Sequence, residues 1–125
     1  MSVQETVNVT VESGAVTATS SVGSCHGLAG EYKLIGLTMV PQAALAADGS
    51  NKYVISVVQG STTVATSLDS SSAAHVAQTA QAFTLSAAGA SLEFGATDVL
   101  KITMTETGTA AMNATYVANF QKVRV

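Results

Sequence analysis

The stretch that decides the fold of this chain is Ser91 to Thr105, SLEFGATDVLKITMT. Apolar and polar residues alternate in two short runs, and the corner Gly95 to Asp98 separates these runs. Side chains along a strand point to opposite faces with a period of two, so Leu100, Ile102 and Met104 share one face. The other face carries mostly threonine and lysine. The pattern is typical of half-buried strands in an antiparallel sheet, joined here by a tight turn.

The same alternation recurs along most of the chain. Turn residues such as Ser13-Gly14, Asp48-Gly49 and Gly60-Ser61 interrupt the strand-like runs at short, fairly even intervals. About eight or nine short strands with this spacing are typical of a sandwich or a barrel. We therefore predict an all-β fold, a single antiparallel β-sandwich that is jelly-roll-like and has about eight strands.

The N-terminal part is predicted to lie outside the most regular strands. The run from Val3 to Thr19 alternates valine with polar residues around a turn, so we expect a hairpin. The segment Ser20 to Gly30 is rich in serine and glycine without a period, which indicates a loop or an extended arm. Within one domain overall, we assign residues 1–24 to a hairpin or arm that contacts neighbours and residues 25–125 to the sandwich core.

Two internal segments depart from simple alternation. The run Glu31 to Val40, EYKLIGLTMV, is apolar on both faces, with Leu34 on one face and Ile35 and Leu37 on the other. Such a strand is expected to be central or to have its outer face covered by a partner. The segment Asp69 to Ala82 is rich in alanine and glutamine but lacks a strong apolar stripe. We expect a crossover loop there, with room for one or two helical turns.

Composition restricts the possible partners. Charged residues make up 10% of the chain, against about 25% in typical domains, which favours a surface covered in part by other subunits over a merely neutral one. The net charge is −3 and the five basic residues are scattered, so we expect no nucleic-acid partner. The chain lacks both a signal-peptide pattern and an apolar run of the ~18 residues that a spanning helix needs. We expect synthesis in a cytoplasm and no membrane partner.

Catalytic and metal-binding patterns are not evident in the sequence. Cys25, the single cysteine, is adjacent to His26, but neighbouring side chains on extended backbone diverge and do not form a nucleophile pair. His26 and His75 are too isolated for a metal site. The oxygen-rich turn Asp48 to Asn51 lacks the acidic spacing of an EF-hand loop, so we interpret it as structural. We predict no enzyme activity, no catalytic, metal-binding or cofactor-binding residue, and no cofactor.

We interpret the polar turn residues and the aromatic residues as structural, with no part in a binding site. Asp48 and Asp98 stand where strands begin, and their carboxylates are expected to accept hydrogen bonds from nearby backbone N–H groups. Glycan-binding sandwiches usually present exposed aromatic platforms, whereas this chain has no tryptophan and its aromatic residues fall in strand-like runs. We expect the core to contain all of them: Tyr32, Tyr53, Phe83, Phe94, Tyr116 and Phe120.

Residues Ala46 to Phe120 resemble a known group of proteins. Their order is AADGSNKYVISVVQGSTTVATSL, a polar crossover, AFTLS, LEFGATDVLKITMTETGTAA and TYVANF. This is similar to the small jelly-roll structural proteins of tailed-phage virions, of the capsid decoration (cement) and head-fibre type, which share a Leu…Gly-Asp-x-Leu-x-Ile corner. Here Thr97 precedes Asp98 in place of glycine, which leaves the turn type open. The resemblance covers about three fifths of the chain and carries over no catalytic residue.

The resemblance implies a structural protein of a bacteriophage virion. Such a protein binds the major capsid protein shell from the outside and stabilises it, and it self-associates as a homodimer or homotrimer. Weak sites repeated over a symmetric shell add up through multivalency. We expect contacts through the Val3 to Thr19 hairpin, the Ser20 to Gly30 loop and the Pro41 to Asn51 loop. The alternative is a head-fibre or tail-associated module that binds a receptor or a glycan.

Overall fold

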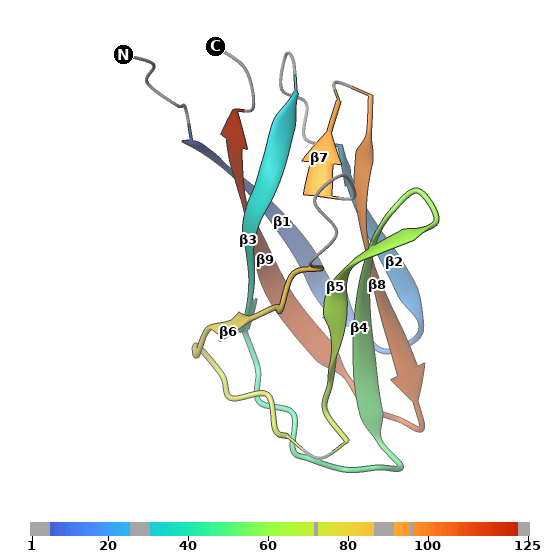
Figure 1. The fold of residues 1–125 in the computed structure, drawn as a ribbon. Coiled ribbons are helices and arrows are strands. Elements are labelled where there is room, and N and C mark those ends of the chain that lie inside the picture. Colours follow the sequence, from blue (N-terminus) through green and yellow to red (C-terminus); the bar gives the residue numbers. More distant parts are fainter. Residues whose placement is uncertain (1–5, 26–30, 72, 87–91, 96, 123–125) are drawn as a thin grey trace.

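The computed structural model describes residues 6–25, 31–71, 73–86, 92–95 and 97–122, which form two antiparallel sheets packed face to face (Figure 1). The first sheet has the strand order β1 (Thr6–Val16), β9 (Met112–Lys122), β3 (Tyr32–Pro41) and β6 (Gln81–Ala82), with β7 (Glu93–Phe94) also paired to β3. The second sheet has the order β2 (Ser20–Cys25), β8 (Val99–Thr107), β4 (Lys52–Gln59) and β5 (Thr62–Asp69).

The strand order is that of a jelly roll. The first strand pairs with the last, the second with the last but one, and the fourth with the fifth. The short strands β6 and β7 pair with opposite ends of β3, Ala82 with Thr38 and Phe94 with Tyr32, so together they fill one strand position. The nine strands of the described residues therefore occupy eight positions, and the predicted jelly-roll-like β-sandwich is confirmed.

The core lies between the two sheets, where their inner faces meet. On β8 the side chains of Leu100, Ile102 and Met104 are at most 2% exposed, as their alternation predicts. Tyr116 and Phe120 face them from the first sheet and are equally buried. Each buried aliphatic or aromatic side chain of this kind contributes about 1.5–3 kcal/mol, so alternation along a few strands supplies most of the driving force for folding.

The corner predicted between Phe94 and Val99 connects the two sheets. Phe94 belongs to the first sheet and Val99 to the second, so the chain changes layers between them. The Asp98 carboxylate accepts the Gly95 N–H at 2.7 Å, and the Asp98 N–H donates to the Gly95 carbonyl at 3.1 Å. Beside the corner, the rings of Phe94 and Phe120 pack edge to face with centroids 5.4 Å apart. The predicted corner is confirmed, and it joins layers instead of two strands of one sheet.

The central strand β3 contains a bulge that removes its second apolar face. The pairing register with β9 shifts between Leu34 and Gly36, so Ile35 is an extra residue. Leu34 before the bulge and Leu37 and Met39 after it all face the core, whereas Ile35 is 45% exposed. The expectation of a strand that is apolar on both faces is therefore wrong, because the bulge shifts the phase of the alternation. The central position expected for the strand is confirmed.

The N-terminal segment contributes one edge strand to each sheet. β1 pairs with β9 and β2 pairs with β8, so the predicted hairpin from Val3 to Thr19 is wrong over the described residues. The predicted loop is also wrong from Ser20 to Cys25, which are paired with β8, and residues 26–30 lie outside the described residues. Serine and glycine form a strand here because pairing with β8 overrides their weak propensity.

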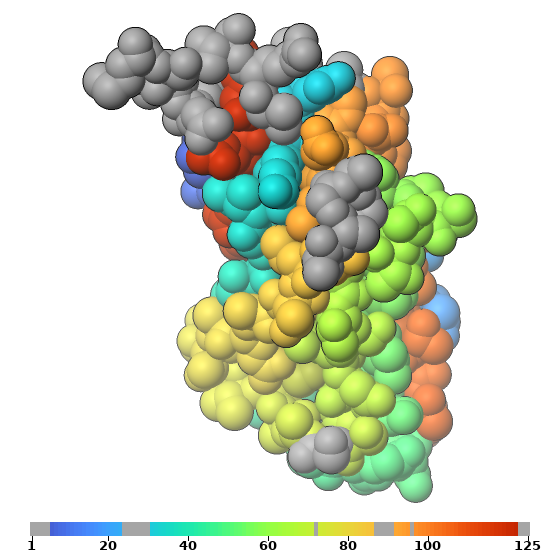
Figure 2. Space-filling model, in the orientation of Figure 1, coloured from blue at the N-terminus to red at the C-terminus, as the bar shows by residue number. Residues whose placement is uncertain are grey.

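The segment from Asp69 to Ala82 is the predicted crossover and leads from the second sheet to the first. Its described residues form turns and contain no helix. Leu45 and His75 exchange two backbone hydrogen bonds of 2.9 and 2.8 Å, and the Gln78 N–H donates to the Pro41 carbonyl at 2.8 Å. These bonds hold the crossover against the β3–β4 connection. The crossover, yellow in Figure 2, covers one side of the lower part of the molecule.

Candidate functional site

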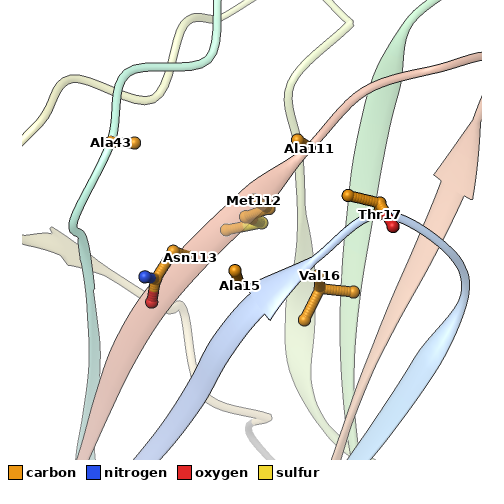
Figure 3. Close-up of a pocket in the computed structure, with 7 residues that line it drawn as sticks. All are labelled: Ala15, Val16, Thr17, Ala43, Ala111, Met112 and Asn113. Carbon is orange, nitrogen blue, oxygen red and sulfur yellow. The ribbon is translucent and has the colours of Figure 1, made fainter.

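An apolar pocket of about 240 Å³ opens where the end of β1, the β3–β4 connection and the start of β9 meet (Figure 3). Seven residues line it: Ala15, Val16, Thr17, Ala43, Ala111, Met112 and Asn113. Three separate segments form the lining. Ala15 to Thr17 lie at the end of β1, Ala43 lies on the β3–β4 connection, and Ala111 to Asn113 lie at the start of β9. The pocket has the size of one apolar side chain or a small group of atoms, and it is open to solvent on one side.

A bulge interrupts β1 just before the residues that line this pocket. The register between β1 and β9 shifts between Glu12 and Ala15, and Gly14 adopts a φ of 67° that favours glycine. The Ser13 hydroxyl fixes the bulge by accepting the Ala114 N–H at 3.0 Å and donating to the Gly14 carbonyl at 2.8 Å. After the bulge β1 stays paired with β9, Ala15 with Asn113 and Val16 with Met112, and these four residues all line the pocket.

A hydrogen bond positions the far wall of the pocket. The Gln42 N–H donates to the Asn113 carbonyl at 2.7 Å, and the Gln42 side-chain amide donates to the Thr115 hydroxyl at 3.1 Å. These two bonds place Ala43 opposite the β1 end. The Thr17 hydroxyl and the Asn113 amide are the polar side-chain groups of the lining, and neither titrates near neutral pH. The pocket can accept an apolar group and orient it with a few hydrogen bonds, but its lining offers no acid, base or nucleophile pair.

The pocket brings together two of the three segments predicted to contact neighbours. Ala15 to Thr17 belong to the Val3 to Thr19 run, and Ala43 belongs to the Pro41 to Asn51 loop. The third segment, Ser20 to Gly30, provides β2, and none of its described residues is among those that line the pocket. Sequence reasoning did not identify the wall Ala111 to Asn113, because its small residues resemble a loop and the strand β9 was not expected to begin there.

The two histidines and the cysteine do not form a site within the described residues. His26 lies outside them, as does the side chain of Cys25. His75 is only 2% exposed, and its Nδ1 has no hydrogen-bond partner in the part of the chain that the structure describes. Burial lowers the pKa of His75, and the charge of Asp69 opposes this shift in part. Over residues 6–25, 31–71, 73–86, 92–95 and 97–122, no three His, Cys, Asp or Glu side chains gather as metal ligands would.

The turn carboxylates have the structural roles that their positions predict. The Asp48 carboxylate accepts the N–H groups of Ser50 at 2.7 Å and Asn51 at 3.2 Å, and these bonds lower the Asp48 pKa. Asn51 has a role that its position in the sequence did not indicate. Its side-chain oxygen accepts the N–H of Thr109 at 2.9 Å and also the Thr109 hydroxyl, so it ties the β3–β4 connection to the β8–β9 turn.

All six aromatic residues are buried, as predicted. Their exposure is 6% or less: Tyr32, Tyr53, Phe83, Phe94, Tyr116 and Phe120. Because the chain has no tryptophan, it contains no aromatic side chain with which to form an exposed stacking platform for a sugar. The outer face of the first sheet is built largely of threonine, asparagine and valine, with Glu12, Lys33 and Glu93 as charged members.

Comparisons with known proteins leave the family of this chain open. The chain matches no protein-family model, and no curated protein or solved structure is significantly similar to it. None of the described residues forms a helix long and apolar enough to cross a bilayer. The jelly-roll architecture and the apolar pocket are therefore the two features on which a proposal for function can rest.

Proposed function

We propose that this protein is a structural component of a bacteriophage virion that decorates the capsid exterior and stabilises it by binding the shell of the major capsid protein. The observation that carries this proposal is the apolar pocket at the end of β1, because two segments expected to contact neighbours meet there. The resemblance of residues 46–120 to decoration and head-fibre proteins supplies the context. On this proposal the protein is made in the host cytoplasm and joins the shell as a homo-oligomer.

The chemistry of the surface supports a binding role. The pocket lining is apolar with an amide and a hydroxyl, so burial of a shell side chain there would gain about 25 cal/mol for each Å² of apolar surface removed from water. The pocket lining carries no charge that would have to be desolvated. The arrangement suits a small apolar anchor that projects from the shell into the decorating protein.

When the protein occupies many equivalent sites on the shell, modest binding at each site adds up to a more stable shell. A protein that binds the assembled shell but not its separated subunits stabilises the assembly, by about 2.7 kcal/mol per site when its free concentration is 100 times the dissociation constant. An oligomer that reaches two shell sites at once adds avidity without new contacts. No reactive group is needed for either effect, which agrees with the chemistry of the pocket.

The alternative is a head-fibre or tail-associated module that binds a receptor or a glycan. Small sandwiches usually bind sugars through exposed aromatic side chains, and every aromatic side chain of this chain is buried. The pocket lining also offers few groups for the polar hydroxyls of a sugar. We therefore rank shell binding above glycan binding.

The test is co-sedimentation of the purified protein with undecorated shells assembled from the major capsid protein of the same phage. Ala111→Lys places a charge at the mouth of the pocket, where residue 111 is exposed, and is expected to weaken binding at least 10-fold. The matched control Thr105→Lys adds the same charge at an exposed site on the outer face of β8 and should bind like the wild type. Wild-type protein that is folded but stays in the supernatant would contradict the proposal.

Point variants test this proposal better than deletion of the N-terminal arm. Removal of residues 1–24 would delete β1 and most of β2, one edge strand of each sheet. Loss of binding after that deletion could then reflect unfolding. Circular dichroism of Ala111→Lys and Thr105→Lys verifies that both variants keep the fold before shell binding is compared.

A further inference from the structure

Most sheet edges of the sandwich are short or covered. An uncovered edge strand presents unpaired backbone N–H and C=O groups, and natural proteins usually protect it. The outer edge of β5 is covered by residues 84–86, since the Thr66 N–H donates to the Thr84 carbonyl at 2.8 Å and the Ser86 N–H donates to the Val64 carbonyl at 2.7 Å. In Figure 2 this golden segment lies against the green β5. At the other end of the first sheet, β6 and β7 have two residues each.

The strand β1 is the long edge that the described part of the chain leaves open. Among the described residues it pairs with β9 alone, in unbroken register from Thr6 to Glu12. These seven residues, TVNVTVE, contain no proline and no lysine, the residues that commonly protect an edge. The bulge lies beyond Glu12, so the stretch itself is regular. The other edge strand on this side, β2, has six residues and contains Gly23.

The inner face of β1 is incompletely covered. Val7, Val9 and Val11 point toward the core and pack against it, yet each remains half-buried. Inner residues of the neighbouring strand β9, such as Ala118 and Phe120, are almost fully buried. Three valines in a row along an open edge leave apolar surface that one further strand would cover.

We propose that the open edge of β1 pairs antiparallel with β1 of a second copy of this chain, across a two-fold axis that passes through Val9. The two first sheets then become one continuous sheet. This deepens the proposed function, because it names the surface through which the protein self-associates, but it does not depend on shell binding.

A second copy is the occupant because β1 is complementary to itself. Around Val9 the pairing sets Val7 against Val11, Asn8 against Thr10 and Thr6 against Glu12 of the other copy. Each inner valine then meets a valine and each outer polar residue meets a polar residue. A slip of one residue would set each inner valine opposite an outer polar residue of the other copy. The alternation therefore favours this register and those shifted from it by an even number of residues. A two-fold axis at Val9 pairs all seven residues of the regular stretch from Thr6 to Glu12.

Charge also favours this arrangement. Glu12 is the single charged residue in the paired stretch, and it lies opposite the neutral Thr6 of the other copy. The two Glu12 side chains stand at opposite ends of the interface, about 20 Å apart at the usual rise per residue. That separation exceeds the Debye length of about 10 Å at 0.1 M salt, so repulsion between them is screened.

The first test is the mass of the protein in solution by light scattering. The wild type is expected to be a dimer, twice the chain mass of 12.6 kDa. Val9→Lys places like charges opposite each other at the two-fold axis and should give a monomer. Val22→Lys is the matched control, a half-buried inner valine on the edge strand β2, and should remain a dimer. A monomeric or trimeric wild type, or a dimer that survives Val9→Lys, would overturn the proposal.

The second test is cross-linking, which does not require a disruptive variant. In a Cys25→Ser background, Asn8→Cys and Thr10→Cys proteins are mixed and oxidised. Directly paired residues have Cα atoms about 4.5–5.5 Å apart, within disulfide range, whereas either variant alone places its cysteines at diagonal positions about 7–8 Å apart. We expect a cross-linked dimer in the mixture and little in each variant alone. A dimer without this pattern would overturn the register, and shell binding is measured separately.

Discussion

The Tyr53 hydroxyl, on β4 of the second sheet, donates to the carbonyl of Val16, the last residue of β1 in the first sheet, at 3.1 Å. The same hydroxyl lies 3.3 Å from the carbonyl of Ala18. Tyr53 is fully buried, and burial raises its pKa with a further contribution from the charge of Glu106. The chain crosses between the sheets at residues 17–19, so this one side chain anchors the crossing from inside the core.

Removal of the Tyr53 hydroxyl is therefore expected to destabilise the protein. Tyr53→Phe keeps the packing of the ring but removes the donor of the buried hydrogen bond to the Val16 carbonyl. An unsatisfied buried polar group costs about 1–3 kcal/mol, and we expect a decrease of that size in the free energy of unfolding. Urea denaturation monitored by circular dichroism measures it.

Tyr116 provides the matched control. Its hydroxyl is buried and has no hydrogen-bond partner among the described residues, and burial raises its pKa. Tyr116→Phe removes an unsatisfied polar atom and should leave stability unchanged or increase it slightly. Equal losses for the two tyrosine variants would show that the hydrogen bond to Val16 does not explain the effect at Tyr53.

Gly108, in the β8–β9 turn, is expected to be intolerant of substitution. It has a φ of 77°, and a Cβ atom there would collide with the Ser50 carbonyl and the Asn51 side chain. Gly108→Ala should therefore cost more than the ~1–2 kcal/mol of left-handed strain alone. Gly60→Ala is the control, because Gly60 has a φ of 61° in a hairpin turn with open space around it. If Gly108→Ala and Gly60→Ala lower the thermal stability equally, the close approach of Gly108 to Ser50 and Asn51 does not contribute to the cost.

Stability is predicted to fall as the pH decreases below about 6.5. The unfolded chain protonates His75 near its ordinary pKa of 6.5, whereas burial lowers the pKa of His75 in the folded protein. Between these two values the unfolded state binds more protons, so the free energy of unfolding decreases as the pH falls through this window. Below the folded pKa the contribution of His75 is fully lost. Urea midpoints at several pH values measure the slope.

A variant without the imidazole identifies the source of this slope. His75→Gln does not ionise, so its stability should be flat from pH 6.5 to about 5. The carboxylates of Asp48 and Asp69 also have lowered pKa values, but from an ordinary value of 3.8, so their contribution is lost at lower pH. A slope that persists in His75→Gln would assign the effect to another group.

Asp98 is expected to stabilise the corner between the two sheets. Its carboxylate accepts the Gly95 N–H at 2.7 Å in a partly buried position. Asp98→Ala should lower the free energy of unfolding by about 1–3 kcal/mol, because that N–H loses its acceptor. Asp98→Asn keeps an acceptor oxygen and should lose less. A full loss in Asp98→Asn would indicate that the negative charge, and not the hydrogen bond, stabilises the corner.

Several features were predictable because they depend on neighbouring residues. The period of two at Leu100, Ile102 and Met104 identifies the core face without reference to any partner strand. Asp48 and Asp98 were identified as turn acceptors because such bonds span only two or three residues. Ala15 and Ala43 come from two of the segments expected to contact neighbours and both line the pocket, and contact with neighbours stays a prediction.

The all-β class, the core face of the regular strands and the turns between them could be predicted from the sequence, since alternation and turn chemistry involve neighbouring residues. Tertiary structure alone decided that β1 and β2 belong to different sheets, that Ile35 forms a bulge and that His75 is buried. Alternation specifies which way a side chain points but not which strand lies beside it. Strand partners come from distant parts of the chain, and a single extra residue at a bulge reverses the alternation that follows.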